Sequence, residues 1–166
     1  MKNKMSIAGK KAWKNNPNIG SEAIHSGDFG ESFITYLLSK KGVNVVRARN
    51  IGFDLFAIDS RGKIFQKNKI IGISVKARIS KTYKKFVPTI PIGSKQIKNS
   101  MKAWKTDAWI GIVVGNKDGS LRAFVFPFKN LKYLSNGKDA VAVSKLDNPA
   151  RQRRASGSVI KLFPIK

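Results

Sequence analysis

The 166-residue chain contains no cysteine, one histidine and only 9 acidic residues. The absence of cysteine excludes a disulfide scaffold, a thiolate zinc site and a cysteine nucleophile. The single histidine, His25, argues against a Ser-His-Asp hydrolase and against a metal site built from several histidines. No apolar run is long enough to span a membrane, and the basic N-terminus lacks the apolar segment of a signal peptide. We therefore expect a soluble, intracellular, cytoplasmic protein with no membrane partner.

Positive charge is what the chain has in excess. Its 33 Lys and Arg residues give a formal net charge of +24, far more than solubility requires. Such a charge attracts polyanions, of which nucleic acid is the commonest in a cell. Hydrophobic residues make up 42% of the chain and aromatic residues 10%, so a folded core is expected. The composition predicts a globular nucleic-acid-binding protein, associated with the nucleoid if its partner is DNA.

The chain divides into three predicted parts. Residues 1–27 form a basic arm with a short helix at 5–14 and a loop at 20–27. Residues 28–134 form an α/β domain, and residues 135–166 form a C-terminal extension with a basic segment and a last strand at 159–163. Within the domain, helices are expected at 29–40, 94–105 and 128–134, and strands at 43–49, 53–58, 70–79, 109–114 and 121–126. The element order predicts a mixed α/β fold.

Local signals set the ends of the two longer helices. Asp28 stands where the N-cap of the 29–40 helix is expected, and Gly42 supplies a stop after it. Ser94 stands at the N-cap position of the 94–105 helix. A further strand begins at residues 64–65 in this interpretation.

Few carboxylates lie in apolar surroundings, and two of them are candidate site residues. Glu31 lies in the first turn of the 29–40 helix and borders its apolar stripe, while Asp54 lies inside an apolar strand. Alternation along the 70–79 strand places Ser74 and Lys76 on the same face. The sequence therefore predicts an acid on the helix (Glu31), a second acid on a strand (Asp54) and a lysine on the 70–79 strand (Lys76).

Each of these residues also has an ordinary structural interpretation. Glu31 fits a first-turn acid that interacts with the helix dipole, and Asp54 fits a strand-end residue that bonds to a turn. Lys76 fits a solvated lysine on an edge strand. The ordered combination is harder to explain in this way than any single residue.

The combination resembles the PD-(D/E)XK nuclease superfamily, and most of all the archaeal Holliday junction resolvases. The resemblance covers roughly residues 27–128, and its short motifs derive their weight from order and spacing. The matching segments are 27–31 for the helix with the first acid, 45–47 and 52–57 for the hairpin with the aspartate, 73–76 for the acid-x-Lys strand, and 91–96 and 108–114 for the second half of the fold.

The resemblance implies a restriction-endonuclease-like core, a central mixed β-sheet flanked by helices. It implies a Mg²⁺ (or Mn²⁺) site at Asp54, at the position of Ser74 and at the carbonyl of Val75, with Lys76 stabilising charge on the phosphorus. Ser74 departs from the family pattern, which has an acid there, and a serine hydroxyl is a poorer ligand for a hard divalent ion. Glu31 supplies the missing charge in one interpretation; in the others the metal binds weakly or catalysis has been lost. Gln96 is a further candidate for contact with phosphate or water, or a plain residue of the helix surface.

Basic residues expected to contact nucleic acid lie along the whole chain. Trp13 in the arm is placed to stack on a base, or else packs on the domain surface. The other candidates are Lys10, Lys11, Lys14, Arg47, Arg49, Arg78, Lys81, Lys84, Lys85, Arg151, Arg153 and Arg154. No base-reading motif accompanies them, so recognition of shape or backbone is expected.

The function predicted from the resemblance is metal-dependent hydrolysis of phosphodiester bonds in DNA, branched or duplex, by a structure-selective endonuclease. Resolution of a junction needs two cuts, so the resemblance also implies a homodimer. Three alternatives remain open: a catalytically inactive DNA-binding module of the same fold, a site-specific endonuclease of the homing or restriction type, and a basic RNA-binding protein.

Overall fold

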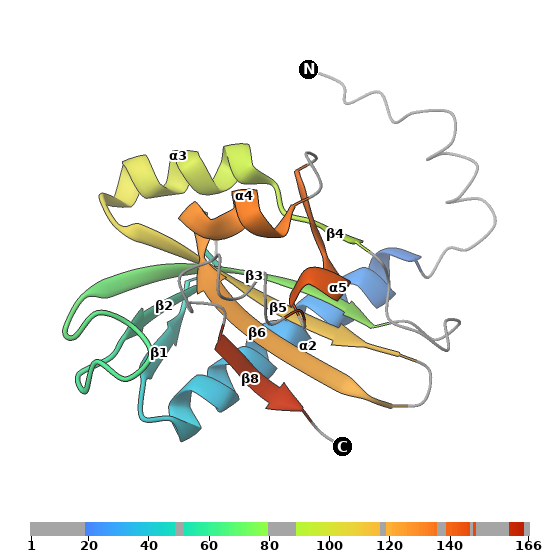
Figure 1. The fold of residues 1–166 in the computed structure, drawn as a ribbon, viewed down its shortest axis with the longest axis horizontal. Helices are drawn as coiled ribbons and strands as arrows, with labels where there is room; N and C mark the ends of the chain where they lie inside the picture. Colours follow the sequence, from blue (N-terminus) through green and yellow to red (C-terminus); the bar gives the residue numbers. More distant parts are fainter. Residues whose placement is uncertain are drawn as a thin grey trace.

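A six-stranded β-sheet runs through the centre of the molecule (Figure 1). The structure is a computed structural model that describes residues 19–48, 52–79, 89–116, 119–135, 139–146, 148 and 160–164. The strand order is β1-β2-β3-β5-β6-β8, in which β3 and β5 are parallel and the other neighbours are antiparallel. A second sheet pairs β4 with β7. The strands are β1 (Asn44–Arg47), β2 (Leu55–Ile58), β3 (Ile70–Ile79), β4 (Thr89–Pro91), β5 (Asp107–Gly115), β6 (Leu121–Pro127), β7 (Ala140–Ala142) and β8 (Ile160–Pro164).

Helices cover both faces of the sheet. The long helix α2 (Ile19–Lys40) packs on one face, and α3 (Ser94–Trp104) lies over the other (Figure 1). The short helices η1 (Phe128–Asn130), α4 (Leu131–Leu134) and α5 (Val143–Leu146) share the side of α3. The predicted class, an α/β fold with a central mixed sheet flanked by helices, is confirmed. Among the helices that the structure describes, none has the length and apolar character needed to cross a membrane.

Strand alternation divides the apolar side chains between two cores. In β3, Ile73 and Val75 pack against the core beneath α2, whereas Ser74 points to the opposite face. Ile110 and Ile112 of β5 belong to the core beneath α3. Because the central strands are covered on both faces, they consist of nearly continuous apolar sequence. A polar residue such as Ser74 in this strand therefore adds nothing to the apolar core, which makes it a candidate for another role.

Helix α2 begins at Ile19, much earlier than the sequence predicts. Asp28 consequently lies inside the helix and is not its N-cap, and the expected loop at 20–27 is helical instead. Gly30 lies inside both the expected and the observed helix, and a Cβ at this position would lie 2.5 Å from the Cβ of Ala77 in β3. The glycine that costs helix propensity thus lets α2 approach the sheet closely. Gly42, with a φ of 79°, follows the end of the helix as expected.

The C-terminal part of the chain contributes two strands to the described fold. β8 pairs with β6 at one edge of the large sheet, and β7 pairs with β4, so parts of residues 135–166 are bound to the domain. The helix expected at 5–14 lies outside the described residues.

Asp59 organises the loop between β2 and β3, where the sequence predicts the start of a strand at 64–65. Its side chain is fully buried and accepts hydrogen bonds from the backbone N–H groups of Arg61, Gly62, Ile64 and Phe65, at 2.6–3.1 Å. These bonds hold the segment in a compact loop rather than in a strand. Burial alone raises the pKa of the Asp59 carboxyl, but the backbone hydrogen bonds outweigh it and hold the pKa below its ordinary value of 3.8.

Replacing Asp59 should therefore destabilise the protein. We expect Asp59→Ala to lower the free energy of unfolding by about 2 kcal/mol, because several N–H groups lose a charged acceptor. Since the folded-state pKa lies below the unfolded-state value, this stabilisation is present above about pH 4 and is lost as the pH falls through the folded pKa. Urea unfolding at pH 7 and pH 3 measures both effects. The exposed Asp107→Ala is the control and should change stability little, although its carboxylate pairs with Lys69 at 2.8 Å.

Candidate active site

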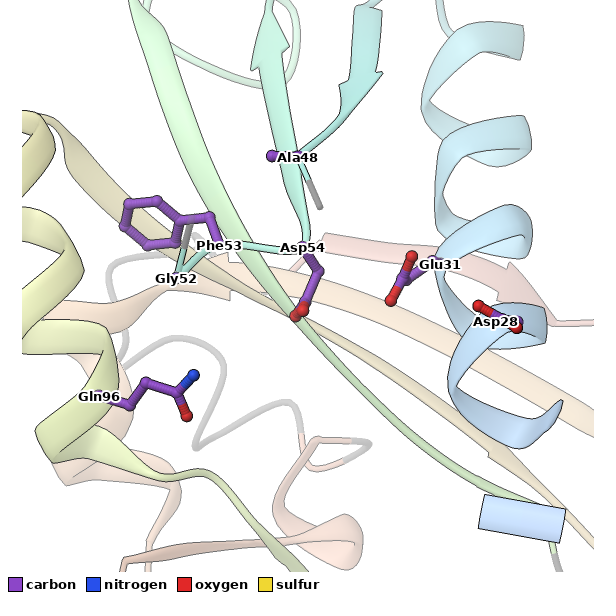
Figure 2. A pocket seen from close by; sticks show the side chains of 7 residues that line it. All are labelled: Asp28, Glu31, Ala48, Gly52, Phe53, Asp54 and Gln96. Atoms are coloured by element: carbon purple, nitrogen blue, oxygen red, sulfur yellow. The ribbon is translucent and has the colours of Figure 1, made fainter. Parts of the chain in front are cut away.

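An open cleft of about 350 Å³ lies where the chain enters β2. Figure 2 shows Asp54 in the middle, with Glu31 and Asp28 on α2 to one side and Gln96 on α3 to the other. The remaining lining residues are Ala48, Gly52 and Phe53. Two helices from opposite faces of the sheet thus present polar side chains to the same opening.

Asp54 is anchored by its main chain and its side chain. Its N–H donates to the carbonyl of Ile73 at 3.0 Å, and its carbonyl accepts from the N–H of Ala48 at 2.9 Å. Its carboxylate Oδ2 accepts a hydrogen bond from the N–H of Val75 at 2.6 Å and from the hydroxyl of Ser74 at 3.3 Å. The position of the carboxylate is therefore set by the neighbouring strand β3.

Two glycines allow the chain to reach this position. A Cβ at Gly72 in β3 would lie 2.4 Å from the ring of Phe53, so the ring packs directly on the strand. Gly52 has a φ of 88°, and a Cβ there would lie 2.2 Å from the hydroxyl oxygen of Ser100 in α3. The residues just before Asp54 are thus packed between β3 and α3, which orders the approach to the cleft.

Glu31 reaches the cleft from α2 and lies near Arg47 of β1. The Nε atom of Arg47 lies 3.9 Å from Oε2 of Glu31. The guanidinium of Arg47 also donates to the carbonyl of Asp28 at 3.1 Å and to the hydroxyl of Ser32 at 2.5 Å. Arg47, which the sequence predicts to contact nucleic acid, therefore fastens α2 to the sheet next to the two carboxylates of the helix.

Ser74, Val75 and Lys76 lie on β3 beside Asp54. Ser74 is 4% exposed, and its hydroxyl is directed at the carboxylate of Asp54. The N–H and C=O groups of a strand residue face the same edge, so the Val75 carbonyl lies on the edge that faces Asp54. Lys76 is half-buried on the face of Ser74, and neither residue is among those that line the described cleft. Arg78, farther along β3, is exposed.

The cleft also contains a carboxylate that sequence reasoning did not include among the site residues. Asp28 lies one helical turn before Glu31, and both line the opening. Residues three apart share a helix face, so this spacing would have indicated Asp28 if the helix had been expected to begin before residue 28. Gln96, in contrast, was a candidate from the sequence and is an exposed lining residue at the start of α3.

Two of the predicted nucleic-acid contacts, Arg47 and Arg78, belong to the part of the chain that the structure describes. Lys10, Lys11, Trp13, Lys14, Arg49, Lys81, Lys84, Lys85, Arg151, Arg153 and Arg154 lie outside the described residues.

The donor atoms at the cleft suit a hard cation more than a soft one. Within the described part of the chain, no group of three or more His, Cys, Asp or Glu side chains is close enough to hold a metal ion. Asp54 and Glu31 supply carboxylate oxygens, and the Val75 carbonyl lies on the edge that faces Asp54. Mg²⁺ is commonly bound by one or two carboxylates together with waters and substrate phosphate, so this oxygen-only set fits it.

Comparison with known proteins finds a distant likeness among solved structures. No protein-family model matches the sequence, and no curated protein matches it either. The structure is similar to that of Hjc, a Holliday junction resolvase from the archaeal hyperthermophile Archaeoglobus fulgidus, with a TM-score of 0.44 and 13% sequence identity. The similarity covers 81% of this chain and 90% of that chain.

Proposed function

We propose that the chain is a divalent-metal-dependent DNA endonuclease of the PD-(D/E)XK type that selects branched DNA. One observation carries the proposal. The carboxylate of Asp54 is held by the hydroxyl of Ser74 and the N–H of Val75 in β3, in a cleft that Glu31 enters from a helix on one face of the sheet and Gln96 from a helix on the other. The residues and the order of their elements are those that the sequence resemblance implies.

Asp54, Glu31 and the Val75 carbonyl are the groups that would hold Mg²⁺. Such an ion, when bound, polarises a phosphate and lowers the pKa of an attacking water. The N–H of Val75 and the hydroxyl of Ser74 hold Oδ2 of Asp54 in one orientation, so the carboxylate need not be reordered when a ligand arrives.

The other polar groups have roles that follow from their chemistry. Lys76 supplies a positive charge beside the segment that holds Asp54, and such a charge stabilises the negative charge that develops on phosphorus during hydrolysis. Gln96 offers an amide donor and acceptor that can orient a water or a phosphate oxygen. Arg47 positions Glu31 by fastening α2 to β1.

Ser74 bears on how strongly the site binds metal. It contributes no charge, but its hydroxyl donates to Asp54, so its role is to orient the acid rather than to replace a carboxylate. The family usually has an acid at the position of Ser74. Here Glu31 and Asp28 of α2 supply negative charge to the cleft instead.

The substrate follows from charge and from the absence of a base-reading motif. A net charge of +24 favours contact with many phosphates, and recognition through the backbone suits a branched structure more than a sequence. Two symmetric cuts across a four-way junction require two active sites, so we propose that the chain acts as a homodimer.

Cleavage of labelled substrates tests this function. We expect incision of a four-way junction in Mg²⁺, slower or absent incision of linear duplex and of single strands, and none in EDTA. Equal cleavage of all three substrates would contradict the selectivity, and the absence of cleavage in both Mg²⁺ and Mn²⁺ would contradict the enzymatic proposal.

A catalytically inactive DNA-binding module is the second candidate, favoured by the uncharged Ser74. It predicts tight junction binding without incision under every metal condition. Parallel binding and cleavage measurements on one preparation separate the two candidates.

A further inference from the structure

A second hollow lies on the other side of the first turn of α3. It is lined by three exposed lysines, Lys98 of α3, Lys129 of η1 and Lys132 of α4, together with Ser94, Ser135 and Asp139. We call it the lysine groove. Two apolar residues, Phe128 and Leu131, complete its lining.

The positive charge of the groove is poorly compensated. None of the three lysines forms an ion pair with a carboxylate among the described residues. The one acid present, Asp139, serves α3: its carboxylate accepts hydrogen bonds from the Ser94 hydroxyl and from the Ser94 N–H, the latter at 2.9 Å. The hydrogen bond from the Ser94 hydroxyl is the main reason that the pKa of Asp139 lies below its ordinary value. Asp139 also interacts electrostatically with Lys98, and Nζ of Lys132 lies 4.9 Å over the ring of Tyr133. The hollow still holds three lysines against one carboxylate, which leaves an excess of positive charge.

Clustered like charges destabilise the free protein unless an anion binds among them. Lysine is a compact point charge with three donors, which suits phosphate oxygens. Ser94 and Ser135 add hydroxyl groups to the same lining. The chemistry of the groove fits phosphate groups in a series, as a nucleic-acid backbone provides.

The groove and the cleft both use the start of α3, but from different sides of the helix. Gln96 lines the cleft and Lys98 lines the groove, and two residues correspond to about 200° around a helix and about 3 Å along it. A DNA backbone that leaves the cleft and crosses the first turn of α3 would arrive at the groove within a few nucleotides.

We infer that the lysine groove binds the phosphodiester backbone of the DNA that flanks the scissile phosphate. This inference rests on the proposed function for its substrate, but its test is independent of cleavage. Lys98, Lys129 and Lys132 hold the flanking strand and do not take part in hydrolysis. None of the three was among the contacts expected from the sequence.

The triple variant Lys98→Ala/Lys129→Ala/Lys132→Ala tests the inference, with the full chain and a fluorescent four-way junction. The slope of log affinity against log salt should become shallower by about 2.7, since each lost phosphate contact contributes about 0.9. At 0.15 M salt the affinity should fall on the order of 100-fold. The single-turnover cleavage rate at saturating DNA should be unchanged, because the groove is separate from the cleft.

The matched control is Lys41→Ala/Lys63→Ala/Lys67→Ala, which removes three exposed lysines after α2 and in the loop before β3. Its slope should change by less than one. Equal slopes for the two triple variants, with thermal melting confirming that both are folded, would overturn the groove and leave the nuclease proposal standing. A wild-type chain that binds DNA through the groove without cleaving it would overturn the enzymatic proposal alone.

Discussion

Asp54→Asn should reduce junction cleavage in Mg²⁺ by about 1,000-fold or more. The amide oxygen of asparagine can still accept the hydrogen bond that Val75 donates at 2.6 Å, so the fold around the cleft should be kept. What is lost is the negative charge needed to hold a divalent cation. The measurement is single-turnover cleavage of a labelled four-way junction at several Mg²⁺ concentrations.

Two controls make this result specific. Junction affinity should change little, because one charge in a chain with 33 basic residues contributes a small part of the polyanion attraction. Asp107→Asn removes an exposed carboxylate outside the cleft and should cleave like the wild type. Wild-type cleavage by Asp54→Asn would show that any nuclease activity belongs to another part of the chain.

Lys76→Gln should reduce the single-turnover rate by about 100-fold, the typical cost of removing one group that stabilises transition-state charge. Glutamine keeps much of the length of the side chain and its capacity to donate, but not its charge. Because Lys76 is not among the residues lining the cleft, the prediction requires its amine to approach the phosphate only when DNA is bound. The expected signature is therefore a lower rate at saturating DNA with an unchanged Mg²⁺ requirement.

Lys67→Gln is the matched control, since it removes an exposed lysine from the loop before β3. If Lys76→Gln and Lys67→Gln both cleave at the wild-type rate, Lys76 has no role in catalysis. The edge-strand interpretation of Lys76 is wrong in either case, because β3 lies between β2 and β5.

Strong, local patterns made much of the fold predictable. The strand at 70–79 has the expected bounds, and its alternation correctly separates Ser74 from Ile73 and Val75. Glu31 and Asp54 were selected because they are acids next to apolar residues, and Gln96 because it stands at the start of the 94–105 helix. The structure brings all three to one cleft.

Tertiary contacts determine the features that the sequence did not reveal. Helix α2 includes Gly27 and Gly30 despite their low helix propensity, and Gly30 packs closely on Ala77 of β3. Because the helix also includes Asp28, this residue shares the cleft with Glu31. The start of α3 has Gly93 in the N-cap position, and Ser94 is bound by Asp139, which is 45 residues away in the chain. No local pattern predicts such a partner. Asp59 likewise replaces an expected strand with a loop by collecting backbone donors from residues that follow it.

Calorimetric titration of Mg²⁺ into the wild-type chain and into Asp54→Asn, each bound to uncleaved junction DNA at low temperature, tests the central claim most directly. The account predicts saturable binding to the wild-type complex and its loss in the variant, because the carboxylate at the start of β2 is the principal ligand. Equal Mg²⁺ affinity in the two complexes would contradict a metal site at Asp54, and with it the proposed mechanism.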